Sequence, residues 1–382
     1  MIPYGRQNIS AADIDSVVEI LKSDFITQGP AIERFEKKIA EFTGAKYAVA
    51  VNSATAALHI ACLAAGLQPD DILYTSPITF VASANCALYC GASVDFCDID
   101  RQTYNLDPIA LEKKLIAAER SGKLPKILVP VHLAGQSCDM EAISRLARKY
   151  GIRLIEDASH AIGGNYRGRR IGSCEFSDMT VFSFHPVKIV TTGEGGMVTT
   201  NDPVLYSKLT LFRSHGITRD ASLMSRNDGP WYYEQQELGF NYRLTDIQAA
   251  LGASQMDRLE AFIGKRNDLA RRYNELLKNI PVICPYVSNQ CLSAFHLYII
   301  RIIPEETKKS HLEVFSALRA AGTRHLMKSP GLDLASVPAN RPRRSSRAAV
   351  RAEPAHRHGR AGNDAAVQPQ DRAKSRNNTV LP

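Results

Sequence analysis

The sequence lacks several features that mark particular classes of protein. No stretch of the 382 residues approaches about 18 uninterrupted apolar residues, which excludes a membrane-spanning helix. The eight cysteines form no C-x-x-C pair and no paired cluster of the metal-binding kind, so we expect reduced thiols and no metal site. No basic segment leads into an apolar run near the N-terminus, so we expect no signal peptide and a cytoplasmic protein.

The net charge of +8 is unevenly distributed along the chain. Residues 1–322 contain 35 Lys and Arg against 35 Asp and Glu, whereas residues 323–382 contain 12 basic and 4 acidic residues. The excess of basic charge therefore lies in the last sixty positions. A nucleic-acid-binding surface on the rest of the chain is not indicated.

Residues 323–382 also lack Phe, Tyr and Trp and contain six prolines. Such a composition cannot easily bury a core, so we expect a disordered basic tail. Two origins are open: a frameshift that replaces the C-terminus with out-of-frame sequence, and a genuine tail that binds nucleic acid or another acidic partner. The absence of aromatic side chains for base stacking favours the frameshift.

Short apolar runs alternate with helical patterns over the first two hundred residues. Strands of roughly four to eight residues between longer helices are typical of βαβ units. We therefore expect an α/β fold with a mostly parallel central sheet and helices on both faces. Ligands of such sheets bind at the carboxyl ends of the strands. Strands are expected at 47–51, 72–75, 93–99, 126–133, 152–156 and 179–184, with helices such as 55–66 and 139–151 between them.

The pattern changes in the last third of the chain. A long helical pattern covers 245–278, and we expect a strand at 295–303 and a helix at 311–322 after it. These elements predict a smaller α+β domain, which we expect to be incomplete because the regular pattern ends at Gly322. The expected organisation is a large domain at 1–250, the start of a small domain at 251–322 and the tail at 323–382.

Two polar segments directly follow expected strands. Lys188 lies five residues after Ser183, where a strand ends, and TTGEGG follows it. A lysine held at such a place can form a Schiff base with pyridoxal phosphate, although taken alone it is more simply a solvated loop lysine. Asp157 ends the preceding strand and could keep a pyridine nitrogen protonated, or could cap the next turn. His160, taken alone, is more simply a hydrogen-bonded core histidine.

Two further segments have the residues to hold a phosphate and an aromatic ring. Residues 52–55, Asn-Ser-Ala-Thr, follow a strand and begin a helix, so their N–H groups and hydroxyls can bind phosphate. An ordinary helix cap is the simpler alternative. Phe80 follows the next strand and could stack on a ring, although most such phenylalanines belong to the core. Together the four segments predict a phosphate site, a stacking aromatic, an acid for a ring nitrogen and a Schiff-base lysine.

Nine blocks of residues 1–322 occur in an order typical of one family. They are ITQGP (26–30), NSATAALH (52–59), PITFVASAN (77–85), HLAG (132–135), EDASHAIG (156–163), SFHPVK (183–188), TTGEGG (191–196), FRSHG (212–216) and GFNYRLTDIQAALG (239–252). With them the chain resembles the DegT-type sugar aminotransferases, which are fold type I pyridoxal-phosphate enzymes. PYGRQ, SDFITQGP and NCALYCGASVDFCDID give a narrower resemblance, to members that act in pseudaminic acid biosynthesis.

The resemblance implies a role for each matching residue. Lys188 would hold pyridoxal 5′-phosphate as a Schiff base and move a proton between Cα of the amino donor and C4′ of the cofactor. Asp157 would pair with the pyridine nitrogen, and His160 would lie near the phenolic oxygen. Phe80 would stack on the ring. The phosphate would be bound by Ala54, Thr55 and Ser183 together with Asn241 of the partner subunit.

The resemblance also implies partners and a reaction. A homodimer with shared active sites follows from the role of Asn241 of the partner subunit. The implied reaction moves the amino group of L-glutamate to C4 of a UDP-linked 4-keto-6-deoxy-N-acetylhexosamine, UDP-2-acetamido-2,6-dideoxy-β-L-arabino-hexos-4-ulose, and leaves 2-oxoglutarate. The residues that would contact the nucleotide-sugar are Tyr4, Asp24, Phe25, Ile26, Thr27, Ala54, Val181 and Gly239.

Three questions stay open at this point. Some relatives replace the lysine by histidine and dehydrate the sugar, so the presence of Lys188 favours transamination. The substrate could still be a different nucleotide-linked keto-sugar. The chain could also bind pyridoxal phosphate and be inactive because of its altered C-terminus.

Overall fold

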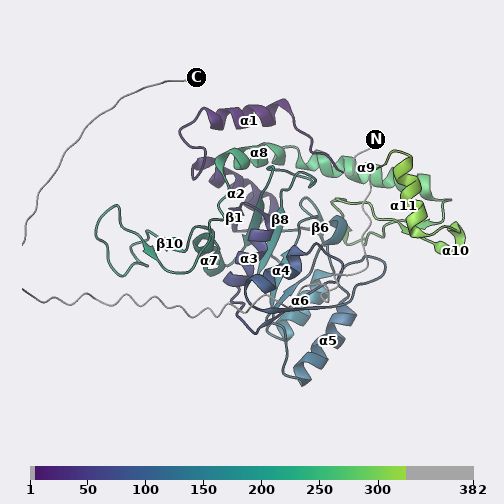
Figure 1. The fold of residues 1–382 in the computed structure, drawn as a ribbon, viewed down its shortest axis with the longest axis horizontal. Helices are drawn as coiled ribbons and strands as arrows, with labels where there is room; N and C mark the ends of the chain where they lie inside the picture. The colour runs from purple at the N-terminus through teal and green to yellow at the C-terminus, as the bar shows by residue number, and fades with distance from the viewer. Residues whose placement is uncertain (1–4, 324–382) are drawn as a thin grey trace, which may run out of the picture. The chain divides into compact units, whose positions relative to one another are not determined.

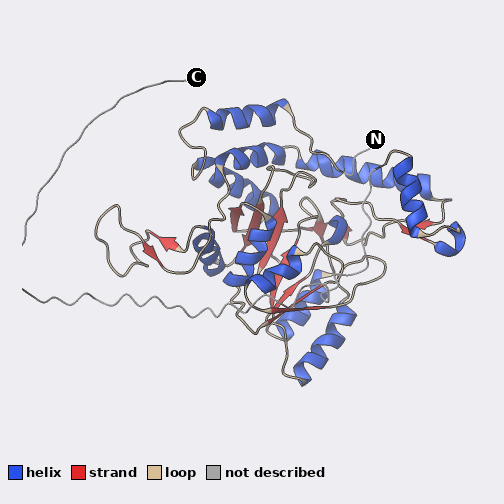
Figure 2. Ribbon diagram, viewed as in Figure 1, coloured by secondary structure: helices blue, strands red, loops and turns tan. Residues whose placement is uncertain are grey.

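A seven-stranded sheet forms the centre of the fold (Figures 1 and 2). The computed structural model describes residues 5–323, so Tyr4 and the expected tail beyond Thr323 lie outside the described residues. The strand order is β1-β9-β8-β5-β4-β2-β3. The strands are β1 (Tyr47–Val51), β2 (Ile72–Thr75), β3 (Ser93–Phe96), β4 (Ile127–Val129), β5 (Arg153–Asp157), β8 (Met179–Ser183) and β9 (Gly196–Thr200).

The sheet is mostly parallel, as expected. The five adjacent strands β3, β2, β4, β5 and β8 are all parallel to one another. β9 is antiparallel to both β8 and β1, so β1 runs in the same direction as β8. The sequence pattern does not predict β9, whose residues, GMVTT, include only two large apolar side chains.

Helices cover both faces of the sheet, as expected. Successive strand residues point to opposite faces, so neighbouring residues of one strand contact different helices. On β8, Val181 packs with α3, α4 and α7, whereas Phe182 packs with α2, α8 and α9. Leu128 and Leu154 pack with α5 and α6. These helices are α2 (Pro30–Thr43), α3 (Ala54–Ala64), α4 (Ala82–Tyr89), α5 (Pro108–Arg120), α6 (Met140–Lys149), α7 (Pro203–Arg213), α8 (Asp246–Met256) and α9 (Leu259–Leu277).

The helical pattern expected at 245–278 is confirmed, but it is divided into two helices, α8 and α9. Arg258 between them has φ −109° and ψ 2°, outside the helical range. Its guanidinium binds Asn8 and Asp13, which lie before and within α1 (Ala11–Leu21). α1 packs beside α8 (Figure 1), so a tertiary contact interrupts a locally helical sequence.

The expected strand at 295–303 is also largely wrong. Only β14 (Arg301–Ile302) is a strand, and it pairs antiparallel with β12 (Val282–Ile283). The residues before it find backbone partners in the loop after β4, where the N–H of Leu297 donates to the carbonyl oxygen of Ala134 (3.2 Å). α10 (Pro304–Thr307) and α11 (His311–Ala320) follow, and α11 matches the helix expected at 311–322. The division into two domains near residue 250 stays a prediction.

Two small antiparallel sheets complete the described part. β6 (Asn165–Tyr166) pairs with β7 (Arg169–Arg170) and β13 (Cys291–Leu292). β10 (Ile217–Thr218) pairs with β11 (Glu234–Gln235) in a loop that extends away from α7 (Figure 1).

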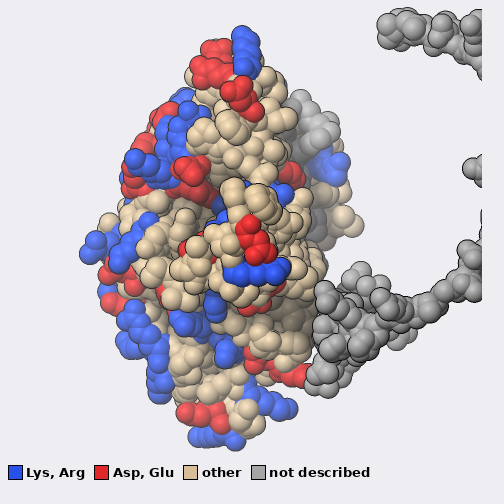
Figure 3. Space-filling model, turned by 90° about the vertical axis from the view of Figure 1, so that its left-hand side faces the viewer, with Lys and Arg blue, Asp and Glu red and all other residues tan. Residues whose placement is uncertain are grey.

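The surface shows no separation of charge on the face drawn in Figure 3, where acidic and basic side chains are interspersed. This agrees with the equal numbers of acidic and basic residues in 1–322. Among the described helices, none combines the length and the apolar character needed to cross a bilayer.

Candidate active site

The carboxyl ends of the parallel strands meet at one edge of the sheet. β5 ends at Asp157 and β8 ends at Ser183, and both side chains are buried. Asp157 pairs with Val181, so Ser183 lies two residues further toward the same edge. The structure thus brings the acid expected for the ring nitrogen and one expected phosphate ligand onto neighbouring strands.

Two donors hold the Asp157 carboxylate. The hydroxyl of Ser83 donates to Oδ2 (2.6 Å), and the N–H of Ser159 donates to Oδ1 (3.1 Å). Ser83 is fully buried in α4, and its Oγ lies 2.7 Å from Oγ1 of Thr79. The sequence reasoning missed both hydroxyls. Two hydroxyl residues four positions apart, just after an expected strand and leading into a helix, are the signal that could have found them.

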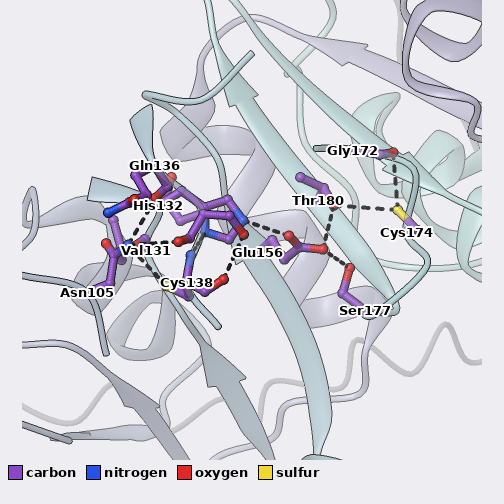
Figure 4. Close-up of polar contacts among 12 residues, drawn as sticks. Asn105, Val131, His132, Gln136, Cys138, Glu156, Gly172, Cys174, Ser177 and Thr180 are labelled. Carbon is purple, nitrogen blue, oxygen red and sulfur yellow. Dashed lines mark hydrogen bonds and ion pairs between the residues drawn. The ribbon is translucent and has the colours of Figure 1, made fainter. Parts of the chain in front are cut away.

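A series of hydrogen-bonded polar side chains runs through Glu156, the residue that directly precedes Asp157 on β5 (Figure 4). Nε2 of His132 lies 2.6 Å from Oε2 of Glu156, and the N–H of Cys138 donates to Nδ1 of His132 (3.1 Å). Because Nδ1 accepts, the ring proton is on Nε2 and is donated to Glu156. The hydroxyl of Ser177 donates to Oε1 of Glu156 (2.5 Å). These contacts fix the residue that directly precedes Asp157 on β5.

The polar chain continues from Glu156 through β8 to a buried thiol. Thr180 donates to Oε1 of Glu156 (3.3 Å), and its hydroxyl lies 3.6 Å from Sγ of Cys174. Burial raises the pKa of the Cys174 thiol to about 12. The thiol therefore stays protonated near neutral pH and donates to the carbonyl oxygen of Thr199 (3.3 Å). At this end, the series of polar contacts joins Cys174 to β8 and β9 and has a structural role.

The start of α3 lies against the end of β8. Ser183 pairs with Gly196 across the sheet, and Gly196 pairs with the last residue of β1. A Cβ on Gly196 would lie within 2.7 Å of backbone atoms of Ser53 and Ala54. The missing side chain thus lets the first turn of α3, with Ala54 and Thr55, approach Ser183. N–H groups of a helix start beside hydroxyls are suited to binding a phosphate.

Lys188 lies in the loop that joins β8 to β9. Its side chain is half-buried, and its backbone N–H donates to the carbonyl oxygen of His185 (2.9 Å). Phe184 donates to Gly195 (2.9 Å) and accepts from the N–H of Thr192 (3.0 Å), so both ends of the loop are tied together. The structure therefore holds Lys188 at the same edge as Asp157.

Two expected ring contacts lie on loops at this edge. Phe80 is 70% exposed, which excludes the alternative that it belongs to the core. Nδ1 of His160 accepts from the N–H of Ala134 (3.3 Å), which places the ring proton on Nε2. The ring of His296 lies 4.4 Å from that of His160. The sequence carries no signal for His296, because its contact with His160 joins distant parts of the chain.

The residues expected to contact the nucleotide-sugar have different surroundings. Val181 is fully buried. Its carbonyl oxygen accepts from the N–H of Ala158 (2.8 Å), so neither its side chain nor this oxygen is open to a nucleotide-sugar in the structure. Gly239 packs so closely on Gly216 that a Cβ would meet backbone atoms at 2.0 Å. Exposed in the loop between α1 and α2 are Asp24, Phe25, Ile26 and Thr27.

Asn241 lies beside the start of α3 of its own chain. Its backbone carbonyl oxygen accepts from Nδ2 of Asn52 (3.4 Å), and Asn241 is exposed to solvent.

Within residues 5–323, no group of three or more His, Cys, Asp and Glu side chains is arranged to hold a metal ion.

The sequence model of the DegT/DnrJ/EryC1/StrS aminotransferase family matches residues 7–359. The chain belongs to this family. It is a sugar aminotransferase, and the aminotransferases of this family depend on pyridoxal phosphate. The match continues beyond residue 322, although the last of the blocks quoted above ends at residue 252.

Two relatives and one solved structure illustrate the similarity. The chain is 41% identical over 323 residues to the UDP-4-amino-4,6-dideoxy-N-acetyl-β-L-altrosamine transaminase of Campylobacter jejuni (strain 81-176), covering 84% of this chain and 82% of the relative. It is 38% identical over 304 residues to the GDP-perosamine synthase of Caulobacter vibrioides, covering 79% and 77%. PseC of Helicobacter pylori, an aminotransferase involved in the biosynthesis of pseudoaminic acid, superposes with a TM-score of 0.75 at 32% identity, covering 85% and 84%.

The residues at the sheet edge fit pyridoxal phosphate. Asp157 offers buried acceptor oxygens that are already oriented by Ser83. Gly196 leaves a backbone cradle between the start of α3 and Ser183. Lys188 lies on the loop between β8 and β9, which begins directly after Ser183. An acid, a phosphate cradle and an amine therefore share one edge.

Proposed function

We propose that this aminotransferase moves the amino group of L-glutamate to C4 of UDP-2-acetamido-2,6-dideoxy-β-L-arabino-hexos-4-ulose in pseudaminic acid biosynthesis. The observation that carries the transfer chemistry is the buried Asp157 carboxylate, fixed by Ser83 at the edge that also holds Lys188. The choice of sugar is supported by the relative from C. jejuni and by the likeness to PseC.

Each side chain at the edge has a defined task in this proposal. Bound pyridoxal phosphate supplies the electron sink for charge that develops on the amino donor and the sugar. Nζ of Lys188 holds the cofactor and moves the proton between Cα and C4′. Asp157 accepts the N–H of the pyridine ring, and His160 donates from Nε2 toward the phenolic oxygen. Phe80 stacks on the ring, and the phosphate is bound by Ala54, Thr55 and Ser183.

The nucleotide-sugar is assigned to the exposed loop between α1 and α2 and to the segment around Gly239. The loop offers the carboxylate of Asp24 and the hydroxyl of Thr27 as hydrogen-bonding groups, with the apolar side chains of Phe25 and Ile26 between them. Tyr4 and Val181 keep their expected roles only as predictions. A GDP-linked or other keto-sugar is the second candidate, because the relative from C. vibrioides is named for GDP-perosamine.

Direct tests begin with the cofactor. We expect the purified protein to show the absorbance band of bound pyridoxal phosphate, and Lys188→Ala to lose both this band and turnover. Lys113→Ala, an exposed lysine on α5, serves as the matched control and should keep both. A wild-type protein without the band would contradict every enzyme assignment.

The substrate is tested by converting L-glutamate to 2-oxoglutarate in the presence of a panel of sugars. We expect turnover with the UDP-linked 4-keto-sugar and little with GDP-4-keto-6-deoxymannose. The reverse preference would favour the second candidate. A cofactor band without turnover of any sugar would mark the chain as an inactive pyridoxal-phosphate protein.

We propose a homodimer in which Asn241 of the partner subunit completes the phosphate site. Mixing two inactive variants, Lys188→Ala and Asn241→Ala, under conditions of subunit exchange tests the arrangement. A hybrid dimer would regain one site with an intact Lys188 and an intact Asn241 of the partner subunit, so activity should return. If Asn241 acts within its own chain, both sites of the hybrid lack one residue and no activity returns.

A further inference from the structure

The segment between β2 and α4 connects the exposed Phe80 ring to the buried Asp157 carboxylate. Thr79 directly precedes Phe80, and its Oγ1 lies 2.7 Å from Oγ of Ser83. Ser83 in turn donates to Oδ2 of Asp157 (2.6 Å) and is fully buried. One short segment thus contacts the carboxylate and also presents the aromatic side chain.

The hydrogen bonds in this chain of hydroxyls have one consistent direction. A serine hydroxyl has one proton, and Ser83 gives it to Asp157, because a carboxylate oxygen accepts. The hydroxyl of Thr79 must then donate to Ser83. The N–H of Ser159 donates to the other carboxylate oxygen (3.1 Å). Both oxygens of Asp157 therefore accept a hydrogen bond from a described residue, which fixes the carboxylate plane. A carboxylate oxygen can accept more than one hydrogen bond, so the group can also accept from a ligand at the sheet edge.

We propose that Ser83 and Thr79 are positioning residues of the transamination reaction, whose hydroxyls orient the Asp157 carboxylate toward the N–H of the cofactor ring. The proposal rests on the role of Asp157 in the proposed function. Because Thr79 and Phe80 are neighbours in the chain, a backbone movement at Phe80 would also displace the outer hydroxyl. Ring stacking and the contact at the ring nitrogen are therefore coupled through the β2–α4 segment.

Variants of the holoenzyme separate positioning from stability. Ser83→Ala removes the inner hydroxyl, Thr79→Val removes the outer one while keeping its shape, and Thr79→Ser keeps it. Ser144→Ala removes a buried hydroxyl from α6 and serves as the control for packing. The measurements are kcat and KM for L-glutamate, and the pH at which the absorbance of bound pyridoxal phosphate changes.

We expect kcat to fall about tenfold in Ser83→Ala and by a smaller factor in Thr79→Val, with little change in KM. The pH of the spectral change should shift in both variants, because the ring nitrogen loses part of its oriented partner. Thr79→Ser should restore the wild-type spectrum, and Ser144→Ala should leave it unchanged. Thr79→Val still decides the question if Ser83→Ala does not fold.

Two results would overturn the proposal in different ways. If the wild-type protein shows the cofactor band and both Ser83→Ala and Thr79→Val keep its kcat and spectrum, the hydroxyls only stabilise α4. If the wild-type protein shows no band, the proposed function itself fails, and the positioning role fails with it.

Discussion

The sheet edge around Asp157 and the region from α9 to α11 differ in how the chain covers its own side chains. Asp157 and Glu156 are at most 5% exposed, and both carboxylates have several hydrogen-bond donors. α11, by contrast, has no buried residue, and Leu312 on it is 66% exposed. Leu276 near the end of α9 is 64% exposed.

This difference shows where contacts among the described residues determine the positions of side chains, and where they do not. Polar side chains at the sheet edge have partners from several strands and from α4, so their geometry is determined by the packed core. By contrast, Leu276 near the end of α9 is largely exposed, and α11 buries no residue at all. Substitutions should therefore affect the two regions very differently.

The largest expected difference concerns the core beneath the edge. Phe182 on β8 is fully buried and packs under α2 and α8. Phe182→Ala should lower the free energy of unfolding by about 3–5 kcal/mol, because it leaves a cavity. Leu312→Ala should change it by less than about 0.5 kcal/mol. Urea denaturation measures both, and similar losses for the two variants would remove the contrast.

A smaller effect is expected for the buried carboxylate of Glu156. Glu156→Leu removes the acceptor of His132, Ser177 and Thr180. Leaving such buried donors unsatisfied should lower the free energy of unfolding by about 1–3 kcal/mol.

The matched control for Glu156 is Asp268 on α9, which forms an exposed ion pair with Arg271. Asp268→Leu should cost less than about 1 kcal/mol, because water screens exposed pairs. Equal costs for Glu156→Leu and Asp268→Leu would mean that the buried chain of polar contacts adds nothing to stability.

Thiol labelling compares the accessibility of cysteines in the two regions without altering the sequence. Cys174 and Cys97 are buried, and burial raises the pKa of each thiol to about 12. They should stay protonated and unreactive toward Ellman's reagent near neutral pH until the protein unfolds. Cys284, between β12 and β13, is half-buried and should react first.

The cysteine variants identify the two phases. Cys284→Ser should remove the fast phase of labelling, and Cys174→Ser should leave that phase intact. A fast reaction of Cys174 in the native protein would show that the sheet opens more readily than its burial indicates.

Local signals predicted much of the fold. The capping box of Ser10 and Asp13 starts α1, and Gly44 with φ 79° ends α2, and both residue types are common at these helix ends. The six expected strands all exist, although β3 and β4 are shorter than predicted. The break at Arg258 and the absence of most of the strand at 295–303 could not be predicted, because both depend on contacts with distant parts of the chain.

In the candidate site, too, the features that depend on contacts between distant residues could not be predicted from the sequence. Lys188 and Asp157 could be placed at one edge because each follows a strand of a parallel sheet. Ser83 could not be connected to Asp157, since 74 positions separate them and only the packing of α4 on the sheet brings them together. The pairing of His132 with Glu156 also depends on neighbouring strands, β4 and β5.

The reversal of the chain between β8 and β9 restricts the freedom of Lys188 before any ligand arrives. Strand pairing and the bonds from Phe184 to Gly195 and Thr192 close this loop at both ends. A short closed loop has few conformations, so little backbone entropy remains to be lost on binding. The strand pairing that completes the sheet also preorganises the lysine.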